Sequence, residues 1–252
     1  KGDQRQLLKA LYETGKPVVL NIMAGRSLVL DFEIEHSDAI LYSFHPGTMG
    51  GPAIAQLIFG DETPSGKTPV TFPKHVGQIP LYYNHNMTGR PANGREELLH
   101  EIPLKAGQTS LGMTSYWLDC PFAPEFPFGY GLTYTTFKYS APEIERTEYG
   151  VNDTVHACVT VRNTGDKEAT EVVQLYVRDL VGSVTGPVKE LKGFKKVAIA
   201  PGQTVKVTFD IDQDMLKFYD PAQSGWVLEK GKFTAYVGAA SDDIRTTVDF
   251  AI

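Results

Sequence analysis

The chain has 252 residues, of which 42% are hydrophobic and 21% are charged, a balance typical of a globular protein rather than a disordered one. Its 24 Lys and Arg residues against 30 Asp and Glu residues give a formal net charge of −6, which argues against binding to nucleic acid or to an anionic membrane surface. No apolar run approaches the roughly 20 residues that a membrane-spanning helix needs.

The first 45 residues predict a helix followed by two buried strands. Asp3, with Gln6 three residues later, is a candidate cap for an opening helix that ends near Gly15. Two nearly continuous apolar runs follow, at residues 18–23 and 39–44. Runs of this kind are typical of strands that are buried on both faces of a parallel sheet.

A glycine-rich turn at residues 47–51 precedes a second expected helix, which runs from Pro52 to about Phe59 and ends at Gly60. The glycines could bring a phosphate to the helix N-terminus, although the Gly-Lys-Ser/Thr ending of a phosphate loop is missing. Close packing of the helix against a strand explains them equally well. The order of helices and strands indicates an α/β domain.

Two strands make a small sheet for such a domain, and two explanations stay open. Either the rest of the sheet lies upstream in a longer protein, or the less regular stretch at residues 66–130 completes it. In the first case the chain should expose apolar surface and associate when it is alone.

The second half of the chain changes to a period of two. Apolar residues alternate with polar ones in rows that turn signals separate, at residues 155–161, 173–177, 205–211, 233–237 and 248–252. This pattern predicts an antiparallel β-sandwich of the immunoglobulin-like or fibronectin type III-like kind, with one face inside and one in water. We therefore expect an α/β portion at residues 1–137 and an all-β sandwich at residues 138–252.

The residues that most often carry chemistry give little signal here. Cys120 and Cys158 have no zinc-ligand spacing; they could pair, but free thiols are the better interpretation, with Cys158 on the outward face of a strand. No metal site is expected, because none of the histidines has ligand spacing; these are His36, His45, His75, His85, His100 and His156. Carboxylates are plentiful in the first half, and which of them converge is left open; they are Asp31, Glu33, Glu35, Asp38, Asp61, Glu62, Glu96, Glu97, Glu101 and Asp119.

The stretch at residues 82–91 is the most site-like, because it mixes flat aromatic rings, amides and Arg90. These groups suit the faces and hydroxyls of sugars. The competing interpretation is a structural loop in which Arg90 forms an ion pair, and the sequence does not decide between the two.

Ordered motifs along nearly the whole chain resemble the C-terminal part of glycoside hydrolase family 3, of the bacterial periplasmic β-glucosidase type. In the first half they lie at residues 15–20 (GKPVVL), 46–51 (PGTMGG), 59–61 (FGD), 64–67 (PSGK), 69–73 (PVTFP), 88–91 (TGRP) and 126–137 (FPFGYGLTYTTF). In the second half they lie at residues 191–194 (LKGF) and 201–204 (PGQT). The chain departs from the family at Met49, where relatives tend to have Glu, and at residues 114–117, where they tend to have Ser-Arg-Tyr.

The resemblance implies a retaining, exo-acting hydrolase that releases terminal sugars from β-glycosides and needs no cofactor. It implies that this chain holds the later part of an α/β sandwich domain and the whole fibronectin type III-like module. The catalytic nucleophile and the acid/base would both lie upstream, so the chain alone would be inactive and would need the N-terminal part of the same enzyme. Thr88, Gly89 and Arg90 are the candidates for the rim of the substrate pocket. The resemblance also implies a periplasmic or secreted setting.

A second interpretation from a different class stays open. The aromatic-rich loops and the β-sandwich would also suit a noncatalytic carbohydrate-binding or scaffold module.

Overall fold

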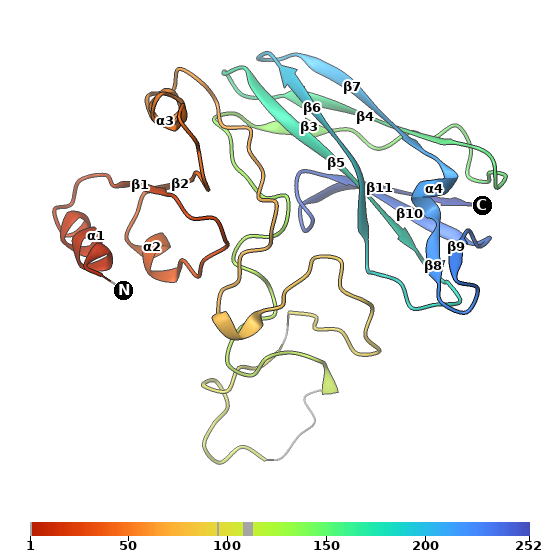
Figure 1. The fold of residues 1–252 in the computed structure, drawn as a ribbon, viewed down its shortest axis with the longest axis horizontal. Helices are drawn as coiled ribbons and strands as arrows, with labels where there is room; N and C mark the ends of the chain where they lie inside the picture. The colour runs from red at the N-terminus through yellow and green to blue at the C-terminus, as the bar shows by residue number, and fades with distance from the viewer. Residues whose placement is uncertain (1, 95, 108–112) are drawn as a thin grey trace. The chain divides into compact units, whose positions relative to one another are not determined.

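The computed structural model of the chain describes residues 2–94, 96–107 and 113–252, which form two compact units (Figure 1). The units interleave along the chain. The first takes Lys1–Glu62, Thr71–Leu81 and Ala92–Phe126, and the second takes Thr63–Val70, Tyr82–Pro91 and Pro127–Ile252.

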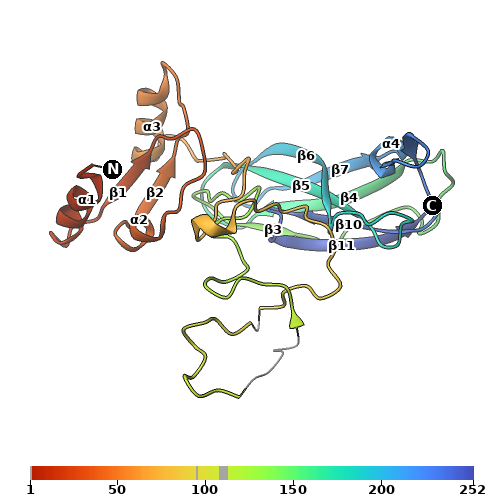
Figure 2. The same ribbon diagram turned by 60° about the horizontal axis from the view of Figure 1, so that its bottom comes forward.

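The first unit contains a small α/β arrangement, which can be followed in Figure 2. Its elements are α1 (Gln4–Tyr12), β1 (Val19–Ile22), α2 (Asp31–Glu35), β2 (Ala39–Tyr42), α3 (Gly50–Phe59) and the 3-10 helix η1 (Val76–Gln78). Strands β1 and β2 pair in parallel with Val19 opposite Ala39, as the apolar runs predict. The helix α2 between them was not predicted.

Three expectations for this unit are wrong. Asp3 stands at the N-cap position of α1, but its side chain makes no cap hydrogen bond with the described residues. Neither strand is buried on both faces, because each starts exposed and continues half-buried, and Val19 is 51% exposed. The stretch at residues 66–130 contributes no strand to this sheet within the described residues, so it does not complete it.

An aromatic cluster surrounds Phe72, one of the best-buried side chains of the first unit. Phe72 is 1% exposed, and its ring meets the rings of Tyr42 at 4.9 Å and Phe126 at 6.0 Å between centroids. The backbone of Phe72 also pairs with that of Phe126. Phe44 has a left-handed backbone conformation (φ 48°), and its ring lies 4.8 Å from that of Tyr42.

The second unit is an antiparallel β-sandwich, as the period of two predicts. One sheet has the strand order β11-β10-β5-β6 and the other the order β3-β4-β7. The strands are β3 (Phe137–Tyr139), β4 (Val155–Asn163), β5 (Ala169–Asp179), β6 (Glu190–Ile199), β7 (Thr204–Ile211), β10 (Lys232–Gly238) and β11 (Ile244–Ala251).

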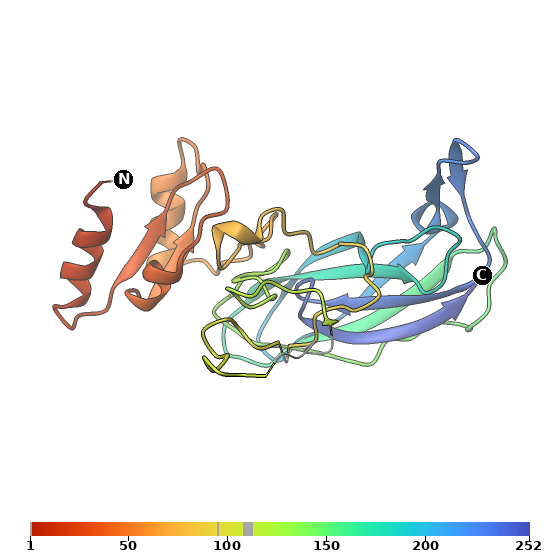
Figure 3. The ribbon, with the colours of Figure 1, turned by 90° about the horizontal axis from the view of Figure 1, so that it is seen from below.

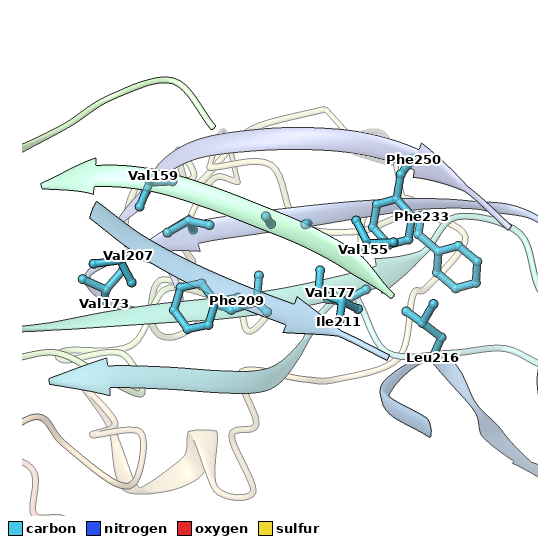
Figure 4. Packing of buried hydrophobic residues seen from close by; sticks show 14 of the residues in the cluster. Val155, Val159, Val173, Val177, Val207, Phe209, Ile211, Leu216, Phe233 and Phe250 are labelled. Atoms are coloured by element: carbon cyan, nitrogen blue, oxygen red, sulfur yellow. The ribbon is translucent and has the colours of Figure 1, made fainter. Parts of the chain in front are cut away.

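The predicted apolar rows form the core of this sandwich (Figure 4). The most deeply buried side chains come from both sheets and include Val155, Val161, Val173, Ile211 and Val237. Cys158 lies on the other face of β4, where its sulfur is 3.1 Å from the Thr208 hydroxyl, and both cysteines are free thiols as expected.

The outer face of the four-stranded sheet is covered along β5, which corrects the expectation that this whole face lies in water. Gln174 is 3% exposed and Tyr176 is 0% exposed, although both belong to the polar row of β5. The cover comes from upstream segments of the same unit: Tyr83 contacts Tyr176, and the carbonyl of Gly129 accepts a hydrogen bond from Gln174. The predicted polar row therefore lies beneath a layer of irregular chain.

A short helix and a hairpin complete the second unit. They are α4 (Gln213–Leu216), capped by the Asp212 side chain, β8 (Phe218–Asp220) and β9 (Gly225–Val227). The hairpin stands out from the sandwich in Figure 3. None of the helices among the described residues is long and apolar enough to cross a membrane.

Candidate functional site

The segment at residues 82–91 belongs to the β-sandwich unit, and Tyr83 is its main contact with the sheet. The Tyr83 ring stacks on Phe128 at 4.4 Å and meets Tyr176 edge-on at 5.7 Å between centroids. Its hydroxyl accepts a hydrogen bond of 3.1 Å from the backbone N–H of Leu191. These contacts hold a segment that has no regular secondary structure of its own.

Backbone pairing continues the attachment beyond Tyr83. The carbonyl of His85 accepts a 2.9 Å hydrogen bond from the N–H of Val188, and Asn86 forms an isolated antiparallel bridge with Pro187. The segment thus lies along residues 187–191 for several residues before it turns away.

The predicted rim residues follow this attachment directly. Thr88, Gly89 and Arg90 are all exposed. Arg90 makes no ion pair with any residue that the structure describes, so the interpretation of Arg90 as one half of a structural ion pair finds no support. Its guanidinium, with five donors, is free to bind a ligand oxygen.

A surface cavity of about 250 Å³ opens beside this segment, between Met87 and the loop at residues 180–187. Arg178 and Asp179 at the end of β5 also line it. Burial raises the pKa of Asp179, and the hydrogen bond from the N–H of Val181 opposes that shift. The sequence pattern did not point to this cavity, since its walls come from segments about 90 residues apart.

A second upstream segment, residues 63–70, is held by a buried ion pair. The Lys67 ammonium lies 3.5 Å from the Glu171 carboxylate, and the side chains are 15% and 6% exposed. Lys67 also donates a 2.8 Å hydrogen bond to the carbonyl of Gly131. The PSGK motif therefore has a structural role in covering β5.

Partly buried ionisable groups gather around Asp242. Burial lowers the pKa of Lys189 and raises the pKa of Asp242, and the two groups partly offset these shifts in each other. Burial also raises the pKa of Tyr130, with a further contribution from Asp242.

Some of the first unit's carboxylates that were candidates for catalysis have local structural partners. Arg5 contacts Glu33 at 2.9 Å and Asp31 at 3.7 Å, and Asp38 accepts a 2.7 Å hydrogen bond from the N–H of Val18. Glu96 accepts backbone hydrogen bonds, first of all from Asn93, and these lower its pKa. Within the described ranges, no group of three or more His, Cys, Asp or Glu side chains is placed to hold a metal ion.

Packing explains one of the glycines at residues 47–51, and backbone conformation explains another. A Cβ on Gly50 would lie 2.6 Å from the Cβ of Pro46, and Gly47 has a left-handed backbone conformation (φ 71°). Such contacts and conformations are reasons for glycine at these positions whether or not a phosphate binds there. The neighbour that requires Gly50 is Pro46 rather than a strand.

Comparison with known protein families identifies this arrangement. The glycosyl hydrolase family 3 C-terminal domain matches residues 1–134, and the fibronectin type III-like domain matches residues 171–241. The chain belongs to glycosyl hydrolase family 3. Its two matched regions are the C-terminal domain of that family and the module that the period of two predicts.

Relatives in this family align over nearly the whole chain. It is 44% identical over 242 residues to a periplasmic beta-glucosidase of Salmonella typhimurium, covering 96% of this chain and 30% of that protein. It is 36% identical over 249 residues to beta-glucosidase BoGH3A of Bacteroides ovatus, covering 98% and 32%. The solved beta-glucosidase of Listeria innocua in complex with glucose superimposes with a TM-score of 0.87 at 37% identity, covering 98% and 32%. The chain thus spans about a third of the length of the relatives that it matches.

Proposed function

We propose that this chain is the C-terminal portion of a retaining, exo-acting β-glucosidase-like hydrolase that releases terminal sugars from β-glycosides. The observation that carries the proposal is the alignment of more than nine-tenths of the chain to proteins named beta-glucosidases. The parent would act in the periplasm or outside the cell, as the name of the Salmonella typhimurium relative suggests.

A retaining glycosidase needs two carboxyl groups about 5–5.5 Å apart, one as nucleophile and one as acid/base. We place both in the upstream part of the parent, as the resemblance to the family implies. The chain would contribute binding rather than proton transfer. Arg90 would donate hydrogen bonds to sugar hydroxyls, with Thr88 and Gly89 beside it on the rim of the pocket.

The partner that this function requires is the upstream part of the same enzyme. Apolar side chains of the first unit stand open to solvent, with Phe59 82%, Met49 69%, Met23 65% and Leu7 62% exposed. Surface of this kind favours association. We therefore expect the chain alone to self-associate in sedimentation velocity, and a uniform monomer would argue against a missing partner.

We also propose that the two modules meet along the chain at residues 137 and 138. The match to the family 3 C-terminal domain ends at residue 134, and β3 begins at Phe137. The boundary would then separate residues 1–137, with the α/β elements, from residues 138–252, which hold the sandwich strands from the second residue of β3 onward.

Turnover of an aryl β-glucoside tests the function directly. The 252-residue chain should show none, and the full-length parent should turn the substrate over. A parent with intact catalytic carboxylates that cleaves no glycoside would refute the proposal. Measurable sugar affinity of the isolated chain together with an inactive parent would instead identify a noncatalytic carbohydrate-binding module.

Arg90→Ala in the parent tests the rim. Loss of a hydrogen bond from a charged donor costs about 1.5–3 kcal/mol, or roughly a 10- to 150-fold rise in KM. Arg162→Ala is the matched control, because Arg162 is an exposed arginine on β4. Equal KM values for the two variants would remove Arg90 from the rim.

A further inference from the structure

We propose that Tyr83 is a positioning residue for the substrate rim: it anchors the segment at residues 82–91 to the β-sandwich and so determines where Thr88, Gly89 and Arg90 stand. The inference rests on the proposed function, because it takes those three residues as the rim. It assigns to the sandwich a part in substrate binding, through a side chain that itself touches no substrate.

The base on which Tyr83 rests is rigid. The Tyr83 and Phe128 rings are nearly parallel, at 16°, and the Tyr83 and Tyr176 rings meet at 72°. Tyr176 is completely buried, and its hydroxyl donates a 2.6 Å hydrogen bond to Gln174. Gln174 in turn donates to the carbonyl of Gly129 at 3.0 Å. Stacked and edge-on aromatic pairs add about 0.5–1.5 kcal/mol each beyond their buried area, so this is a strong attachment for one side chain.

The contacts of the segment follow one another along the chain from Tyr83 towards the rim. After Tyr83, the backbone contacts of His85 and Asn86 with residues 187–188 continue the pairing, and the rim then begins two residues later. While Asn86 stays paired, the chain from Asn86 to Arg90 can reach at most about 14 Å. The Tyr83 ring supports this pairing from the preceding residues, so its loss should also loosen the His85 and Asn86 contacts. The Arg90 guanidinium would then explore a larger volume, and its effective concentration at the sugar would fall.

Three variants separate anchoring from folding and from direct binding. Tyr83→Leu removes the ring stack and the hydroxyl. Tyr83→Phe keeps the stack and removes only the oxygen that accepts the Leu191 N–H. Tyr219→Leu is the control, because it makes the same change at a half-exposed tyrosine on the β8–β9 hairpin of the same unit.

The first measurement is amide hydrogen exchange in the 252-residue chain. Tyr83→Leu should accelerate exchange of the Val188 and Leu191 amides, which donate to His85 and Tyr83, about tenfold or more while the β4 amides keep their protection, which shows that the sandwich is folded. Tyr83→Phe, which the fold should tolerate, should accelerate exchange of the Leu191 amide. Unchanged exchange at these positions in both variants would overturn the anchoring.

The second measurement is steady-state kinetics of the full-length parent with an aryl β-glucoside. Tyr83→Leu should raise KM about tenfold and change kcat less than about twofold, because binding and not chemistry is affected. In an Arg90→Ala background the same change should have little further effect, since the group that it positions is gone. Tyr219→Leu should leave both constants unchanged.

The outcomes distinguish this inference from the function on which it rests. Faster exchange of the Val188 and Leu191 amides with an unchanged KM would overturn the positioning role of Tyr83 while Arg90→Ala still raised KM. An Arg90→Ala parent with a normal KM would remove the proposed rim itself, whatever Tyr83 does.

Discussion

Replacing Lys67 by Met should destabilise the β-sandwich unit by about 3–5 kcal/mol, the usual cost of leaving one member of a buried ion pair without its partner. The pair lies 3.5 Å apart with side chains 15% and 6% exposed, so solvent screens it little. The carbonyl of Gly131 also loses its hydrogen bond from Lys67. Met keeps most of the volume of Lys, and thus the charge accounts for most of the loss.

Native-state amide exchange of β5 is the appropriate assay, because the chain has two units and their unfolding need not be a single transition. The expected loss corresponds to exchange faster by roughly two to three and a half powers of ten. Lys217→Met is the matched control in the same unit, since its partner Asp214 is 78% exposed; it should cost less than about 1 kcal/mol. Adding Glu171→Leu to Lys67→Met should recover most of the loss. If Lys67→Met cost no more than Lys217→Met, the ion pair would not be what holds residues 63–70 in place.

Three further predictions concern other parts of the chain. Gly129→Ala should cost about 1–3 kcal/mol in urea unfolding, because its backbone is left-handed (φ 81°) and the new methyl group would clash with Gln174; a neutral variant would contradict this geometry. Phe72→Ala should remove about 3–5 kcal/mol from the first unit, seen as faster exchange of the β1 and β2 amides, and unaltered exchange there would show that the aromatic cluster is not its core. Asp179→Asn should stabilise the second unit relative to the wild type, and by more as the pH rises above 3.8, the ordinary pKa of an Asp carboxyl. Burial raises the pKa of Asp179 in the folded state, so the wild-type fold loses stability when this carboxyl ionises, whereas Asn stays neutral. A constant difference in urea midpoint between about pH 3 and pH 7 would refute that sign.

The sandwich strands were predictable where period two is strong. The rows that begin at Val155 and Val205 became β4 and β7, because each alternates without interruption between core and outer face. Strand β6 was missed, since its lysines and Gly193 break the alternation and a register shift lies opposite it between Leu175 and Tyr176.

Contacts between distant segments explain what the pattern could not reveal. The alternation predicts that Tyr176 points outward from β5. It is buried because Tyr83, which stacks on Phe128, packs over it. In the same way, composition directed attention to Arg90, but nothing local to Tyr83 distinguishes it from its exposed neighbour Tyr82. The candidate rim was therefore visible in the sequence, and its support was not.

The interleaving of the two units bears on how such a protein could be assembled from modules. The chain passes from one unit to the other at residues 62–63, 70–71, 81–82, 91–92 and 126–127. Residues 63–70 and 82–91 are synthesised long before β5, so they cannot pack on that strand until it has also been made. A recombination event at one junction that exchanged only residues 138–252 would separate Tyr176 from Tyr83 and Glu171 from Lys67. The sandwich should therefore be inherited together with the domain that precedes it, rather than shuffled as an independent piece.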